Sequence, residues 1–146
     1  MTQAAPPLDT RPAAPPAGAC AGLLLFAHGA RDPRWAQPFE VVAERVRAAR
    51  PGTPVGLAYL EFMSPGLVQA AAELVALGCQ HIEVMPLFLG AGGHVRKDLP
   101  VLMDALRSAH PGVQFGLQPA VGEVDSVIQA MADAALAALA TLESGA

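Results

Sequence analysis

The sequence predicts an α/β fold of flavodoxin type, a three-layer sandwich on a four-stranded parallel sheet in the order 2-1-3-4. Three features predict it: four apolar runs with the character of strands, helical periodicity between and after them, and turn residues at most boundaries. Strands that alternate with helices of a dozen or more residues are joined by right-handed crossovers, which make the strands parallel. At 146 residues the chain has the length of one domain.

The first strand and helix follow an extension rich in Ala and Pro. Residues 1–20 cannot bury a core with this composition, so we expect them to be disordered. The apolar run at 22–27 predicts a strand buried on both faces, and it stops at His28. Residues 34–50 carry apolar side chains at helical spacing, and Pro51-Gly52 ends this helix.

The second helix and third strand carry strong boundary signals. Residues 55–62 form the second predicted strand, and Ser64-Pro65 after it resembles an N-cap with proline at the first helical position. That helix ends before Gly78. Residues 81–89 form a third strand, in which Pro86 conflicts with a central position because proline cannot donate to a β-ladder.

The last units complete the predicted domain. A helix at 95–109 follows a glycine-rich loop, residues 113–118 form the fourth strand, and a final helix covers 123–142. These elements define one domain at residues 21–142, followed by a short disordered tail at 143–146.

Composition and charge exclude several classes of protein. Apolar residues make up 53% of the chain, too many for a disordered protein. A net charge of −4 argues against a nucleic-acid surface, and no uncharged apolar run reaches the roughly 18 residues that span a membrane. The start of the chain does not resemble a signal peptide, so we expect a cytoplasmic protein. Cys20 and Cys79 lack CxxC spacing and indicate neither a zinc knuckle nor a redox pair.

The candidate site is placed by the predicted topology. Open parallel sheets bind ligands beyond the carboxyl ends of the strands, where the strand order reverses. His28 follows the first strand and His94 follows the third, so both face this switch point, with Glu61 at the end of the second strand. Imidazole binds borderline divalent metals and also titrates near neutral pH. The alternative is that each histidine only forms hydrogen bonds and that Glu61 only pairs with an arginine.

Glycine and basic residues surround the two histidines. Gly92 and Gly93 belong to a loop that lacks the spacing of known phosphate-binding motifs, so it forms a turn or leaves room for a flat ligand. Four cations lie close in sequence to the histidines and would form a rim suited to a substrate with several carboxylates: Arg31, Arg34, Arg96 and Lys97. His81 and His110 occupy other positions and are expected to have structural roles.

Two motifs resemble those of the short sirohydrochlorin cobaltochelatases, a CbiX-like group of the class II chelatases. The first motif is Phe26-Ala27-His28-Gly29-Ala30-Arg31-Asp32-Pro33. The second runs from Pro86-Leu87-Phe88-Leu89 through Gly93-His94-Val95 to Asp98 and Pro100. Tyr59-Leu60-Glu61-Phe62 and Ser64-Pro65 match the strand end between them. The resemblance covers residues 22–139, and the pair of motifs at this separation is highly specific.

The resemblance implies a chelatase (a lyase) that inserts a divalent metal into sirohydrochlorin without ATP, in cobalamin or sirohaem biosynthesis. Cobalt is the expected metal, with iron or nickel as alternatives, and the metal is a substrate rather than a bound cofactor. His28 and His94 match the family's metal ligands and proton acceptors, whereas Glu61 matches a position that is acidic in some relatives. Short members form homodimers that build the cleft. Ala30 replaces a family serine and removes a hydroxyl near the site.

Two other functions use the same features. A non-catalytic carrier of metal or tetrapyrrole needs the same ligands, and only turnover separates it from a chelatase. Histidine phosphatases also place a His-Gly pair after the first strand, but they need an arginine before the histidine. Ala27 occupies that position here.

Overall fold

The computed structural model describes residues 20–90 and 92–145, although the side chain of His94 is outside that description. Four parallel strands form one sheet in the order β2-β1-β3-β4. The strands are β1 (Cys20–Ala27), β2 (Val55–Tyr59), β3 (Cys79–Pro86) and β4 (Gln114–Leu117). The predicted fold class and strand order are confirmed. The expected disordered segment at 1–20 lies outside the described residues apart from Cys20, which begins β1.

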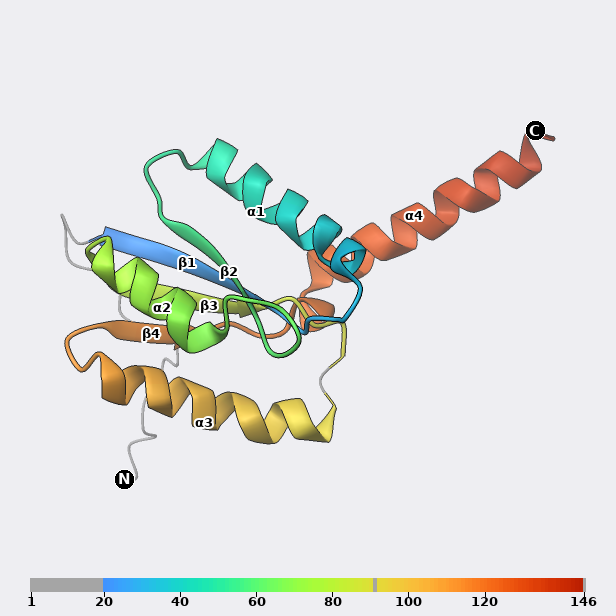
Figure 1. Cartoon of the computed structure of the whole chain (residues 1–146). Helices are drawn as coiled ribbons and strands as arrows, with labels where there is room; N and C mark the ends of the chain where they lie inside the picture. The colour runs from blue at the N-terminus through green and yellow to red at the C-terminus, as the bar shows by residue number, and fades with distance from the viewer. Residues whose placement is uncertain (1–19, 91, 146) are drawn as a thin grey trace, which may run out of the picture.

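Helices cover both faces of the sheet (Figure 1). Helix α1 (Gln37–Ala49) lies on one face, and α2 (Leu67–Ala76) and α3 (Gly93–Ala109) lie on the other. Side chains of a strand alternate between faces. Leu24 and Phe26 of β1 therefore join the core under α2 and α3, while Leu25 packs toward α1.

Pro86 is the last residue of β3, and its position resolves the conflict seen in the sequence. The next residue, Leu87, donates its backbone N–H to Phe26 of β1 over 2.7 Å. Since N–H directions alternate along a strand, the missing N–H of Pro86 would point toward β4. The pairing of β3 with β4 reaches Leu117, opposite Val84, and a hydrogen bond from Gln118 N–H to Val84 O over 2.9 Å. Pro86 stands where the next donor of the ladder would be, so the pairing ends there.

All four helices begin two or three residues from the expected positions, and α2 and α3 show why. Helix α2 begins at Leu67 with Gly66 as its N-cap, so Ser64-Pro65 belongs to the preceding loop rather than to the helix start. Helix α3 begins at Gly93 and continues through Pro100. A proline in a helix removes one intrahelical hydrogen bond, and the rest of this long helix remains regular.

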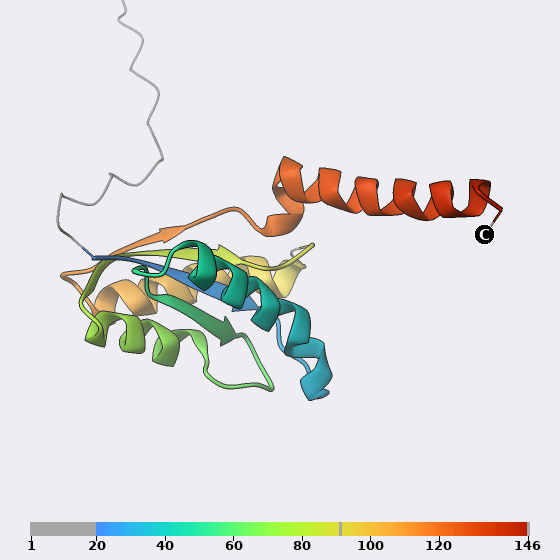
Figure 2. The ribbon, with the colours of Figure 1, turned by 90° about the horizontal axis from the view of Figure 1, so that it is seen from above.

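Helix α4 (Asp125–Glu143) leaves the body of the molecule, as Figures 1 and 2 show. It follows a short 3-10 turn, η2 (Val121–Glu123), and none of its residues is buried. By length and composition this helix could also cross a membrane. Its larger apolar side chains are exposed: Ile128, Met131, Leu136, Leu139 and Leu142. The helix itself was predicted, but a three-layer sandwich would place it against the sheet, and here it does not cover the sheet.

Candidate functional site at the carboxyl edge of the sheet

The loop after β1 is fixed to the loop after β2 by backbone hydrogen bonds. Leu60 N–H donates to Ala27 O over 2.9 Å, and Glu61 N–H donates to His28 O over 3.1 Å. Gly29 allows this approach because its φ is +91°, and a Cβ at this position would collide with the carbonyl of Glu61. The residue after His28 therefore has to be a glycine for the two loops to stay paired.

His28 and Glu61 meet as the sequence predicts. Nε2 of His28 lies 3.2 Å from Oε1 of Glu61, and each side chain is 48% exposed. The imidazole also meets the ring of Phe88 edge to face, with 6.0 Å between the centroids. The ring is thus oriented on one side by an apolar wall and on the other by a carboxylate, and it stays open to solvent.

A cavity of about 420 Å³ opens in front of this pair. Its lining residues are His28, Leu60, Glu61, Val95 and Asp98. Val95 and Asp98 come from the first turns of α3, so the amino end of that helix lies at the cavity. His94 directly precedes Val95, and the backbone of the predicted second ligand therefore reaches the same place as His28. The structure does not describe the side chain of His94.

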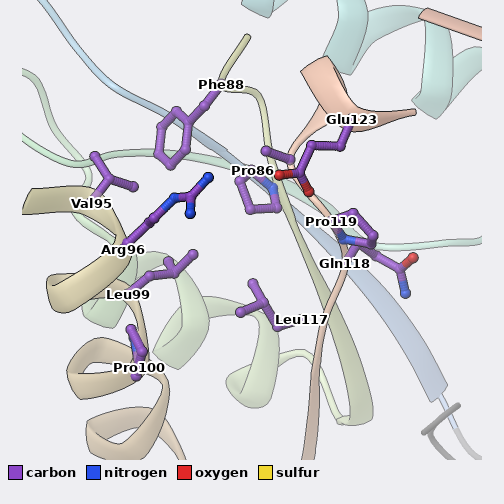
Figure 3. A pocket seen from close by; sticks show the side chains of 11 residues that line it. Pro86, Phe88, Val95, Arg96, Leu99, Pro100, Leu117, Gln118, Pro119 and Glu123 are labelled. Carbon is purple, nitrogen blue, oxygen red and sulfur yellow. The ribbon is translucent and has the colours of Figure 1, made fainter. Parts of the chain in front are cut away.

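Apolar hollows flank this cavity on both sides. One hollow of about 360 Å³ lies between α2 and α3 and shares Leu60 with the central cavity. Another, of about 260 Å³, lies between α3 and the end of β4 and shares Val95. Figure 3 shows this second hollow, where Arg96 reaches out from α3 and the carboxylate of Glu123 points inward from the opposite wall. The carboxyl edge therefore carries a row of neighbouring hollows with mainly apolar lining.

The predicted basic rim is divided among several environments. The guanidinium of Arg31 lies 4.8 Å from the centroid of the Phe62 ring, an exposed aromatic with a positive φ of 67°. Arg34 forms an ion pair with Asp32 over 2.9 Å, and hydrogen bonds from Arg34 hold the pKa of that carboxyl below its usual value. Arg96 lines the hollow beside β4, and Lys97 is exposed on α3.

The glycines before α3 have open surroundings. Gly92 is the N-cap of α3 and Gly93 its first residue. A Cβ at either position would meet no atom within 4 Å. Packing within the described part of the chain therefore does not require glycine at these two positions.

Two other histidines lie away from this cavity. His81, on β3, is buried and its Nε2 lies 2.8 Å from Oε1 of Glu83. His110 caps the carboxyl end of α3, at the opposite edge of the sheet. Both environments agree with the structural roles expected for these residues.

Sequence reasoning missed two residues of the site. Asp98 lines the cavity, and its position four residues after His94 on a helix was a usable signal, because such residues share a face. Phe88 contacts the ring of His28, but a phenylalanine near the end of a predicted strand carries no such signal. Among the described residues, no group of three or more His, Cys, Asp or Glu side chains gathers tightly enough to hold a metal ion.

Comparisons with known proteins agree with this geometry. The CbiX family model matches residues 22–138. A curated protein from Saccharolobus solfataricus named sirohydrochlorin cobaltochelatase is 35% identical over 82 residues, which cover 56% of this chain and 62% of that protein. One of the same name from Methanocaldococcus jannaschii is 31% identical over 88 residues, covering 60% of this chain and 62% of that protein. The chain thus matches less than two thirds of the length of these relatives.

Solved structures share the fold. A CbiX protein from Marinobacter aquaeolei superposes with a TM-score of 0.74 and 31% identity, covering 83% of this chain and 98% of that chain. The sirohydrochlorin chelatase SirB from Bacillus subtilis, solved with cobalt, superposes with a TM-score of 0.68 and 23% identity. That match covers 76% of this chain and 47% of SirB.

Proposed function

The chain belongs to the CbiX family, and from that premise we propose that it is an enzyme that inserts a divalent metal ion into sirohydrochlorin without ATP. The reaction takes sirohydrochlorin and M²⁺ and yields metallo-sirohydrochlorin and two protons. One observation carries this proposal: an accessible imidazole, His28, and a carboxylate, Glu61, share one cavity at the carboxyl edge with 3.2 Å between Nε2 and Oε1.

The chemistry of metal insertion needs a metal ligand and a proton acceptor at one place. Glu61 is close enough to accept a proton from Nε2 of His28, and once that proton has left, the nitrogen offers its lone pair to a borderline metal ion. His94 is the second metal ligand in this mechanism, and Asp98 adds a carboxylate to the same cavity. Glu61 or a histidine then collects the two pyrrole protons.

The shape of the carboxyl edge supports a flat macrocyclic substrate. The central cavity shares lining residues with its two neighbours, and the walls of these two neighbours are mainly apolar, as a macrocycle needs for its faces. Gly92 and Gly93 leave space where side chains would intrude. Arg31, Arg34, Arg96 and Lys97 surround this edge in the proposal, and their charges suit the carboxylates of the substrate.

The proposed metal is Co²⁺, which would serve cobalamin synthesis, and the name of the curated relatives supports it. Fe²⁺, for sirohaem synthesis, or Ni²⁺ would bind the same imidazole, because ligand type alone does not separate these ions. In each case the metal is a substrate, and the proposal includes no permanently bound cofactor. We also propose that the protein works in the cytoplasm, without nucleic acid or membrane as a partner.

A homodimer belongs to the same proposal. Helix α4 exposes an apolar stripe that would be costly in water. The side chains of β3 that face α2 and α3 are buried. On the other face, Met85 of β3 and Leu87, which directly follows β3, are only half-buried. A second copy supplies both missing surfaces at once, because α4 of each chain can cover this open half of its partner's sheet. The three charged residues of α4, Asp125, Asp133 and Glu143, are acidic, and the stripe itself is apolar, which fits an apolar protein surface.

An absorbance assay tests the proposed reaction. Sirohydrochlorin is mixed with Co²⁺, Fe²⁺ or Ni²⁺, and the rate of metal insertion is compared for the wild type, His28→Ala and His94→Ala. We expect each variant to lose at least about 100-fold in rate, as is usual when a proton-transfer group or ligand is removed. His110→Ala is the matched control, since this histidine lies at the opposite edge, and it should keep full activity.

The same assay decides between enzyme and carrier. A carrier would bind Co²⁺ stoichiometrically without accelerating insertion above the uncatalysed rate. Full activity in the His28→Ala/His94→Ala double variant would overturn the mechanism, provided that circular dichroism shows an unchanged fold.

A further inference from the structure

The two cysteines of the chain meet at the amino edge of the sheet. Cys20 begins β1 and Cys79 begins β3, and their Sγ atoms lie 3.3 Å apart. The residues are 59 positions apart in sequence, and the absence of CxxC spacing gave no sign of this contact. The chain has two cysteines in all, so each is the other's only possible intramolecular partner.

The backbone already has the geometry that a cross-link needs. Cys20 and Cys79 are direct partners on neighbouring strands, and the register shifts between Cys20 and Ala21. Neighbouring strands lie about 4.8 Å apart, inside the roughly 4.4–6.8 Å that separate the Cα atoms of disulfide-bonded cysteines. Gly22 lets the thiol of Cys79 approach the backbone of β1, since a Cβ there would lie 2.9 Å from Sγ. The sulfur atoms can therefore bond by side-chain rotation alone.

We propose that Cys20 and Cys79 form an intramolecular disulfide that joins the amino ends of β1 and β3 when the protein meets a low-molecular-weight disulfide, RSSR. In the first step one cysteine thiolate attacks RSSR, forms a mixed disulfide and releases RS⁻. In the second step the other thiolate attacks the protein sulfur of that mixed disulfide and releases a second RS⁻. The two cysteine sulfurs lose two electrons, RSSR gains them, and the two thiol protons leave with the products as two RSH.

Exposure sets the order of these steps. Cys20 is half-buried and reaches solvent, whereas Cys79 is buried. Burial and the hydrogen bond with Cys20 raise the pKa of the Cys79 thiol to about 12. Cys20 therefore reacts with RSSR, and Cys79 closes the bridge. The thiolate is the attacking species, so closure by the buried Cys79 should be faster at higher pH.

The bridge acts on stability rather than on the carboxyl-edge site. Along β1 it lies about 26 Å from His28, eight residues away at about 3.3 Å per residue. It closes a long loop, which restricts the unfolded chain. Oxidation should raise the Tm by about 10 °C, and it should leave the folded site unchanged. The inference does not depend on the proposed reaction.

Thiol counting on the native full-length chain tests the proposal. The reduced protein is incubated with oxidised glutathione, denatured, treated with a maleimide and weighed by mass spectrometry. We expect two maleimide adducts before oxidation and none after it, with a mass lower by two hydrogens and no bound glutathione. The oxidised chain should run as a monomer on a non-reducing denaturing gel.

Single variants give the order of the steps. Cys79→Ala should accumulate one glutathione at Cys20, and Cys20→Ser should accumulate almost none at the buried Cys79. Neither variant should gain Tm on oxidation. A stable glutathione adduct or a chain-to-chain disulfide as the end product in the wild type would overturn the proposal. So would a bridge that forms only in denaturant.

Discussion

In the proposed mechanism, Nε2 of His28 holds either a proton or a metal ion, and the two compete for one lone pair. With a proton, this nitrogen donates to Glu61, 3.2 Å away. Without it, the lone pair is available to a metal ion, and Glu61 is the adjacent base. Phe88 fixes the plane of the ring, so the same atom faces the cavity in either state. The proposed mechanism therefore links metal capture and proton release at one residue.

Gly29 is the residue on which this arrangement depends. We predict that Gly29→Ala lowers the free energy of unfolding by about 2–3 kcal/mol, since the φ of +91° and the collision with the Glu61 carbonyl both oppose a side chain. Urea unfolding followed by circular dichroism measures this loss. Gly52→Ala is the matched control, because its Cβ would meet nothing within 4 Å. Equal stabilities of the two variants would refute this account of the loop.

At the scale of elements, the sequence determined most of the framework and some of its details required the structure. His28 and Glu61 were expected to meet, because the ends of neighbouring parallel strands share an edge. Pro86 was interpreted as a conflict with a central strand, because the position at which β3 and β4 stop pairing is a tertiary property that the sequence does not show. The Cys20–Cys79 contact depends on the register of β1 and β3, which spacing along the chain does not reveal.

The amino end of α3 provides the element-scale prediction. Gly93→Leu should raise the KM for sirohydrochlorin about tenfold or more, because the new side chain would enter the space that the proposal assigns to the macrocycle, while the unfolding midpoint stays unchanged. Steady-state kinetics at saturating Co²⁺ gives the KM, and Gly112→Leu, with equally open surroundings at the other edge, is the control. An unchanged KM in Gly93→Leu would show that the macrocycle lies elsewhere.

At the scale of the whole molecule, one strand order explains both where the candidate site lies and why α4 does not pack on the sheet of its own chain. The order β2-β1-β3-β4 brings the loops after β1, β2 and β3 to one edge. Helix α4 follows β4 at the border of the sheet, and the half of the sheet beside α1 is left open. The sequence predicts that 123–142 is helical because helix formation is a local property. The sequence does not predict which sheet this helix covers, because the same apolar stripe can pack on the sheet of its own chain or on the sheet of a second copy.

The assembly itself can be tested with two substitutions on α4. Leu139 lies on the apolar stripe with Met131 and Leu142, whereas Ala137 lies about half a turn away, on the side of Asp133. We predict that Leu139→Glu converts a dimer into a 15.0 kDa monomer and lowers chelation at least about tenfold, while Ala137→Glu changes neither. Sedimentation equilibrium measures the mass, and flotation with phospholipid vesicles checks the competing occupant. A monomeric wild type, or a wild type that floats with the vesicles, would contradict the dimer, because the apolar stripe would then be covered by something other than a second chain.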